Sequence, residues 1–464
     1  MARIGSNRGR LDRISPLDAS NLRVEDRGLP MHIAALAMLD GPIPGCEPGQ
    51  TELDVLRRAV DRRLHLAPRL RQLLYRPGTG LGPPVWVDDA DFDIRRHVHS
   101  RSVPAPGDEA ALLAVCSELN AARLDPSSPL WELWLLTGLA SGRRAVLIRL
   151  HHVVADGIAA LGMLGALLDS GPDTAVGRAP GWVPAPVPAV LELAADRFRR
   201  LLSALGRAAD GLRRPSLVLA RCAVLGQLAG RLAHEGRAPR TSLNVPVTGS
   251  SRVILIRADL ERARTVAHAH GGTVNDVILA AVAGGARRVL LGRGEFQPDL
   301  VLKASVAASV RSPSSQQGAG NRVGIIIVPL PAGEPDPGRR LTRVAAATRE
   351  RKKLPPYQPN GRLAQRWMLR TMQRQRLVNV LVSNLPGPAA PLQVAGQRVA
   401  ELFQIGVVQG NLTVSVGALS YAGRLNLDLV GDHGAIPDLA VFAAGMSETL
   451  GLLGVLAGAG PGAQ

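Results

Sequence analysis

Two adjacent histidines, followed four residues later by an aspartate, are the side chains in this sequence best suited to chemistry. They belong to the segment His151-His152-Val153-Val154-Ala155-Asp156-Gly157. An imidazole titrates near neutral pH, so it can take a proton from a hydroxyl that attacks a carbonyl carbon. The segment therefore indicates a general base, as acyl transfer from a thioester to an alcohol requires. Metal ligation and burial in a core are the alternative roles for a histidine pair.

The residues before this segment predict a strand, and those after it predict a helix. Residues 144–152 are rich in branched apolar side chains, and apolar residues recur at helical spacing over 158–167. Side chains alternate along a strand, so we expect the two histidines to point to opposite faces. Asp156 can orient an imidazole, cap the helix or pair with an arginine, and Gly157 allows a sharp turn.

Motifs of several other enzyme classes are absent from the sequence. It contains no H-E-x-x-H zinc motif, no G-x-S-x-G elbow, no Walker loop and no dinucleotide fingerprint. Cys46, Cys116 and Cys222 are far apart and lack the spacing of a zinc site or a redox pair. We therefore expect neither a metal nor another cofactor, and the cysteines are typical of a protein of the reducing cytosol.

The composition describes a globular protein with a strong positive charge. Of 464 residues, 46% are hydrophobic and 20% charged, and this length favours two domains. The formal charge of +17 suggests nucleic-acid binding, but the arginines are scattered and both stacking aromatics and recognition motifs are missing. We therefore expect no nucleic-acid partner. The arginines reflect either the codon bias of a GC-rich genome or attraction to an anionic membrane surface.

The sequence predicts a cytoplasmic protein that does not cross a membrane. Residues 1–16 are basic and polar without the apolar segment of a secretory signal. No uninterrupted apolar run reaches the roughly 18 residues of a spanning helix. A basic amphipathic helix is predicted from Leu191 to Arg207, and a more apolar helix at 216–232. This pair either packs on the domains or docks on a membrane surface.

The chain is predicted to have three parts, because a proline-rich stretch at 171–188 separates two regions of mixed strands and helices. We place a first domain at residues 1–185, a helical crossover at 186–245 and a second domain at 246–464. In the second domain the patterns predict helices at 277–291 and 437–453 and strands at 253–256, 300–306, 323–329, 377–383, 412–420 and 424–430.

Short motifs spread over nearly the whole chain give a more specific assignment. In order, they are Ile14-Ser15-Pro16-Leu17-Asp18-Ala19, Pro30-Met31-His32, Trp86-Val87-Asp88-Asp89, Phe92-Asp93, Leu124-Asp125, Pro129-Leu130-Trp131-Glu132, the histidine segment, Thr273-Val274-Asn275-Asp276, Gly320-Asn321, Val382-Ser383-Asn384-Leu385-Pro386-Gly387-Pro388 and Ser420-Tyr421-Ala422-Gly423. HHxxxDG is the signature of the coenzyme A-dependent acyltransferase superfamily. The ordered set resembles its bacterial wax ester synthase/diacylglycerol acyltransferase branch.

The resemblance implies an α+β fold of two chloramphenicol acetyltransferase-like domains, with a substrate channel at their interface. It implies that His152 removes the hydroxyl proton and returns it to the leaving thiolate, without a covalent acyl-enzyme. Asp156 would belong to the catalytic motif by holding its loop, and His151 and Gly157 would be structural. Three further residues would line the channel or contact the developing oxyanion, although turn and cap chemistry also explains their types. They are Asn275, Ser383 and Asn384.

The resemblance further implies long-chain acyl-CoA as co-substrate and diacylglycerol as acceptor, giving triacylglycerol. A fatty alcohol giving wax ester, another lipid or polyketide hydroxyl, and a non-catalytic lipid-binding role are alternatives. We expect peripheral attachment to an anionic surface, at the inner face of the plasma membrane or at lipid droplets. Two departures leave the level of activity open: Asn21 replaces an aromatic residue, and Ala307-Ala308 replaces a segment that contains a proline.

Overall fold

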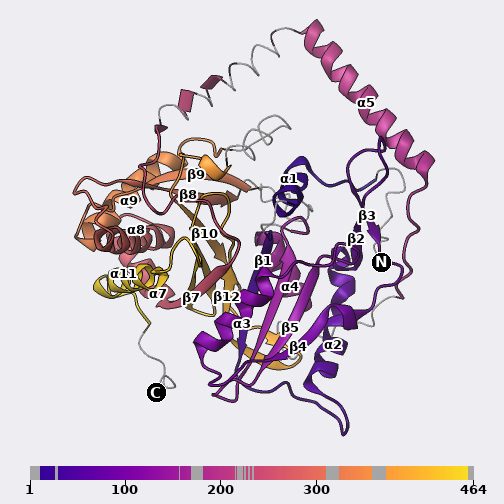
Figure 1. The fold of residues 1–464 in the computed structure, drawn as a ribbon, viewed down its shortest axis with the longest axis horizontal. Coiled ribbons are helices and arrows are strands. Elements are labelled where there is room, and N and C mark those ends of the chain that lie inside the picture. Colours follow the sequence, from indigo (N-terminus) through magenta and orange to yellow (C-terminus); the bar gives the residue numbers. More distant parts are fainter. Residues whose placement is uncertain are drawn as a thin grey trace.

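Two mixed α/β domains lie side by side, each built around a six-stranded sheet, and helix α5 (Val190–Arg213) stands apart from both (Figure 1). The computed structural model of the protein describes residues 11–26, 30–155, 157–168, 181–214, 216, 223, 226–227, 230–231, 235–309, 323–357 and 372–457. The expected fold class is thus observed. Asp156 and most of the predicted helix at 216–232 lie outside the described residues.

The sheet of the N-terminal domain has the strand order β11-β12-β1-β6-β5-β4. Its strands are β1 (His32–Leu39), β4 (Val98–Ser102), β5 (Trp131–Thr137), β6 (Arg144–His151), β11 (Gln393–Val394) and β12 (Gln397–Ile405). The helices are α1 (Pro16–Glu25), α2 (Glu52–Arg63), α3 (Glu109–Ala121) and α4 (Gly157–Leu167), and a separate small sheet contains β2 (Gln72–Tyr75) and β3 (Val85–Asp88). Two strands of this domain, β11 and β12, therefore come from the second half of the chain.

The sheet of the C-terminal domain has the order β7-β14-β13-β10-β8-β9. Its strands are β7 (Ser251–Asp259), β8 (Leu302–Ser309), β9 (Val323–Leu330), β10 (Val380–Pro386), β13 (Val414–Tyr421) and β14 (Arg424–Asp432). The helices are α7 (Leu260–Ala269), α8 (Val274–Gly292), α9 (Pro337–Lys352) and α11 (Leu439–Leu452). The segment at Ala307-Ala308 continues β8 as a regular strand, since Ala307 pairs with Ile325 and Ala308 with Gly324.

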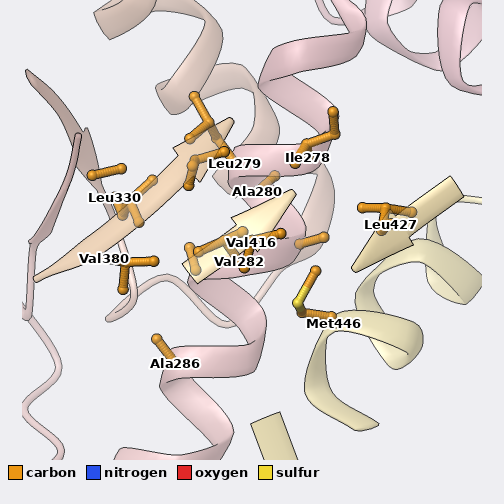
Figure 2. Packing of buried hydrophobic residues seen from close by; sticks show 14 of the residues in the cluster. Ile278, Leu279, Ala280, Val282, Ala286, Leu330, Val380, Val416, Leu427 and Met446 are labelled. Atoms are coloured by element: carbon orange, nitrogen blue, oxygen red, sulfur yellow. The ribbon is translucent and has the colours of Figure 1, made fainter. Parts of the chain in front are cut away.

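Helix α8 is the centre of the C-terminal core. Figure 2 shows its apolar side chains between Val416 and Leu427 of the sheet and Met446 of α11. Glycine allows α11 to approach closely, because a Cβ at Gly285 would lie 2.5 Å from Cδ1 of Phe442. A helix buried on nearly all sides explains why its sequence is apolar around most of the circumference.

Apolar packing and several polar contacts, among them those of one arginine, join the two domains. Residues of α3 and β12 pack with Val253 and Leu255 of β7 in a shared buried cluster. Arg257 of β7 lies 2.8 Å from Glu401 of β12 and 2.5 Å from Glu109 of α3. Burial alone would lower the pKa of Arg257, but hydrogen bonds to the two carboxylates raise it above its usual value. These contacts fix one sheet relative to the other.

Helix α5 touches the rest of the protein only near its start, among its described side chains. Leu193 packs beside Val85 and Val87, and Asp196 pairs with Arg13 at 2.5 Å. The other described side chains of the helix are exposed. The sequence left two alternatives for this helix, packing on the domains or docking on a membrane surface. The first is wrong for the apolar face of α5, which does not pack on either domain.

No helix in the described part of the chain combines the length and apolar character needed to span a bilayer. The strands and helices predicted around residues 144–167 and in the second domain are observed, with bounds that differ by a few residues. Helices α7 and α9 and strands β11 and β12 were not predicted.

Candidate active site

His152 lies in the turn that follows β6. The strand ends at His151, and the N–H of His152 donates to the carbonyl oxygen of Met31 at 2.7 Å. The N–H of Val154 donates to the carbonyl of His151 at 2.9 Å and closes the turn. His152 is half-buried, whereas His151 is fully buried. The turn, and not the strand alternation we expected, therefore separates the two rings.

One ring nitrogen of His151 accepts a hydrogen bond, and the other lies close to a carboxylate. Its Nδ1 accepts a hydrogen bond of 2.9 Å from the N–H of Val153, and its Nε2 lies 2.9 Å from Oε2 of Glu25. Val153 is the residue after His152, so this contact ties the buried ring to the turn. Sequence reasoning missed Glu25, because nothing in its spacing from the histidine motif indicates the contact.

Glu25 also meets a second buried histidine. Its Oε1 lies 3.0 Å from Nε2 of His32, and Nδ1 of His32 lies 3.1 Å from the carbonyl oxygen of Asn120. His32 and His151 are directly paired residues of β1 and β6. Burial by itself would raise the pKa of Glu25, but the two imidazoles outweigh it and hold this pKa well below its usual range.

Gly157 lies where the two halves of the chain meet. A Cβ at this position would come 3.1 Å from Cδ1 of Leu385 on β10. The φ of Gly157 is not in the left-handed region, so close approach and not a sharp turn accounts for glycine here. The contact brings the histidine motif beside the Val382-to-Pro388 motif, although the two are far apart in sequence.

Ser383 and Asn384 are half-buried residues of β10 next to this contact. The pairing of β10 with β8 runs only from Val380 to Val382, whereas its pairing with β13 continues to Pro386. The carbonyl oxygen of Ser383 accepts a hydrogen bond of 3.0 Å from the side chain of Gln404 on β12. The strand segment that carries both residues is thus fixed from the N-terminal sheet.

Asn275 lies in the first turn of α8 and is half-buried. Its neighbour Asp276 closes a capping box with Thr273, accepting from the Thr273 N–H at 2.7 Å. This turn packs on α9, since a Cβ at Gly272 would lie 2.9 Å from Cβ of Ala345. The structure thus places Asn275 at the start of α8 in the C-terminal domain, and it brings the histidine turn next to β10.

The described residues include no group of three or more histidine, cysteine, aspartate or glutamate side chains that could hold a metal ion. Cys46 and Cys116 are free thiols, and burial raises the pKa of Cys116 to about 12, so this thiol stays protonated. The histidine turn therefore carries a half-buried imidazole, that of His152, next to the fully buried imidazole of His151.

Comparison with known proteins identifies the family to which this chain belongs. Residues 14–278 match the wax ester synthase/diacylglycerol acyltransferase catalytic domain, and residues 319–454 match the WS/DGAT C-terminal domain. The probable diacylglycerol O-acyltransferase tgs1 of Mycobacterium tuberculosis H37Rv is 31% identical over 459 residues, which cover 96% of each chain. The chain therefore belongs to the WS/DGAT family and is an acyl-CoA-dependent acyltransferase.

Solved structures agree with this class. The wax ester synthase/diacylglycerol acyltransferase of Marinobacter aquaeolei VT8 is similar with a TM-score of 0.67 and 25% identity, covering 95% of this chain and 98% of that one. A starter condensation domain of rhizomide synthetase shares the fold with a TM-score of 0.61 at 16% identity, covering 97% of each chain. The family and the two-domain chloramphenicol acetyltransferase-like fold expected from the sequence are thus confirmed.

Proposed function

We propose that this acyltransferase moves a long-chain acyl group from coenzyme A to diacylglycerol and so makes triacylglycerol. The acceptor is supported by the relative tgs1, which carries the name of a diacylglycerol O-acyltransferase and matches this chain almost from end to end. Acyl-CoA is the co-substrate, and the reaction needs no metal or prosthetic group.

His152 is the general base in this proposal. The observation that carries it is the contrast between the two motif histidines: His151 has both ring nitrogens held in the interior, whereas His152 is half-exposed beside the Gly157–Leu385 contact. A base must reach a substrate hydroxyl, so only His152 is suitably placed.

The proton and electron pairs balance without a covalent enzyme intermediate. His152 accepts the hydroxyl proton as the acceptor oxygen attacks the thioester carbon. The C–S bond then breaks, and the imidazolium returns the proton to the thiolate of coenzyme A. Ser383 and Asn384 would line the channel near the developing oxyanion, with Asn275 as a further polar residue of the channel and Asp156 holding the motif loop.

Wax ester synthesis is the second candidate. It is favoured by the structural match to the Marinobacter enzyme, whose name joins both activities. The two reactions differ in the acceptor, since a fatty alcohol replaces diacylglycerol, and the chemistry at His152 is the same.

The test supplies the purified protein with labelled palmitoyl-CoA and, in parallel, diacylglycerol, hexadecanol or no acceptor. Labelled triacylglycerol as the main product supports the proposal, wax ester supports the second candidate, and the absence of any ester contradicts both. His152→Ala should lower turnover by roughly 10²- to 10⁴-fold with little change in melting temperature. Near-normal turnover of the folded variant would show that His152 is not the base.

We also propose that the protein attaches to the surface of an anionic membrane or lipid droplet through α5. An apolar stripe runs along this helix at i, i+3, i+4 and i+7 spacing and includes Leu191, Phe198 and Leu205, which are 83%, 60% and 57% exposed. Leu193 and Asp196, which hold the helix to the protein, lie on a different face. The stripe therefore points away from the protein.

The charges of α5 suit a surface of anionic headgroups. Arg197 and Arg199 flank the apolar stripe, and Arg200 pairs with Asp196 at 3.0 Å on the opposite face. Each arginine near an anionic surface contributes about 1 kcal/mol, and salt screens this attraction. An isolated helix with exposed leucines is poorly stabilised in water, so burial of this stripe in lipid would supply the missing packing.

Co-sedimentation with vesicles tests the attachment. Vesicles that contain phosphatidylglycerol should bind the protein at low salt, and vesicles of phosphatidylcholine alone should bind it less. Leu201→Asp on the stripe should weaken binding, whereas Ser203→Asp on the opposite face, with the same change of charge, should weaken it much less. Equal loss in the two variants, or no binding at low salt, would contradict the proposal.

A further inference from the structure

Glu25, His32 and His151 form a buried cluster for which the proposed chemistry has no use. The cluster joins the end of α1, the start of β1 and the end of β6, and the two imidazole centroids are 5.9 Å apart. In the sequence, His32 stands out only as part of the Pro30-Met31-His32 motif. The hydrogen bonds around the cluster determine where its protons lie.

His151 must carry its proton on Nε2. The N–H of Val153 points at Nδ1 of His151, and a backbone N–H can only donate, so Nδ1 must present its lone pair. The remaining ring proton is then on Nε2, where it faces the carboxylate of Glu25. His151 is therefore a neutral imidazole of one defined tautomer.

His32 has different neighbours from His151. Its Nδ1 faces the carbonyl oxygen of Asn120 and its Nε2 faces the carboxylate of Glu25, and both of these groups only accept. His32 thus lies between two acceptors and occupies the other oxygen of Glu25.

We propose that Glu25 is a positioning residue that holds His151 in its Nε2–H tautomer and so fixes the turn that presents His152. With the proton on Nε2, Nδ1 is free to accept from Val153, which follows His152 directly. In the other tautomer, or in the imidazolium, an N–H of the ring would face the N–H of Val153 and the turn would lose this anchor. The inference rests on the proposed role of His152 as the base.

Two substitutions of Glu25 separate tautomer control from charge. In Glu25→Gln the amide oxygen can accept from Nε2 of His151, and the amide nitrogen can donate to Nε2 of His32, whose Nδ1 still faces the carbonyl oxygen of Asn120. The tautomer of His151 survives, so we expect kcat within about threefold of the original. Glu25→Ala removes the acceptor, and a misplaced turn should lower kcat on the order of 10²-fold with a much smaller change in KM.

Glu52→Gln is the matched control. Glu52 pairs with Arg144 at 2.8 Å, at the opposite end of the same two strands, where Arg144 lies across from Leu39. The side chains of Glu52 and Glu25 are 22% and 18% exposed, so their burial is similar. This variant should change the melting temperature without lowering kcat.

The experiment combines kinetics with nitrogen NMR of the full chain labelled with ¹⁵N-histidine, the two resonances being assigned by single substitutions. We expect His151 to be protonated on Nε2 in the original protein and in Glu25→Gln. Protonation of His151 on Nδ1, normal kcat in Glu25→Ala, or an equal loss of kcat in both Glu25 variants would overturn the inference. The spectra alone report the tautomer of His151. They therefore test this inference even if the protein transfers no acyl group to the acceptors tried.

Discussion

Asp428 gives the protein a stability that depends on pH in a direction unusual for a carboxylate. It lies fully buried on β14, where Oδ2 accepts from the N–H of Gly406 at 3.2 Å. Its Oδ1 has no hydrogen-bond partner within the described residues and lies against Gly417, where a Cβ would come 2.0 Å from it. Burial raises the pKa of Asp428 from 3.8 to about 7, and backbone hydrogen bonds oppose this only in part.

The folded state therefore binds a proton that the unfolded chain has already released. Between the unfolded and folded pKa values, the free energy of unfolding falls as the pH rises, by about 1.4 kcal/mol per pH unit. In Asp428→Asn the side chain at this position is neutral at every pH, so the variant does not lose this part of the free energy of unfolding as the pH rises. From about pH 5 to about pH 8, the variant should gain roughly 2.5 kcal/mol relative to the original protein.

Urea unfolding followed by tryptophan fluorescence across this range measures the difference. Asp125→Asn is the control, because hydrogen bonds from Ser127 lower the pKa of Asp125 and keep it ionised throughout, so its difference from the original should stay constant. Parallel stability curves for Asp428→Asn and the original protein would refute the argument.

Three further predictions concern the arrangement of the site. Gly157→Ala should lower turnover several-fold at nearly constant melting temperature, because the added Cβ would press on Leu385. A second substitution, Leu385→Val, should restore turnover. Unchanged turnover in Gly157→Ala would contradict the importance of this contact. Asp276→Ala should reduce the free energy of unfolding by about 1 kcal/mol through loss of the α8 cap, whereas Asn275→Ala should change turnover with little effect on unfolding. Residues 1–185 alone should give an insoluble or inactive fragment, because β1 loses its partner β12, and a soluble, active fragment would argue against the two-domain site.

The elements predicted best are those with strong local patterns. The apolar run at residues 144–152 gives β6, and the stripe of leucines in 191–207 gives α5, because both signals lie within the segment itself. Helix α9 was missed, since arginines fill much of its sequence and only a few buried side chains mark its inner face.

The candidate site was predictable as a motif but not as a geometry. The histidine segment is recognisable from its own residues. The contact of Gly157 with Leu385, and the contacts of Glu25 with His32 and His151, join residues whose positions in the sequence form no recognisable pattern. The pairing of β12 with β1 is equally invisible, because a strand pattern reveals a buried face but not its neighbour.

Strand β12 is synthesised long after β1, the strand with which it pairs. Ala34 of β1 pairs with Ile405 of β12, so a ribosome adding about 5–20 residues per second completes this partner on the order of half a minute after β1. During that interval the apolar strand has an open edge to which other chains can add. Until the second half is made, the nascent N-terminal domain exposes a strand edge that β12 covers in the finished protein.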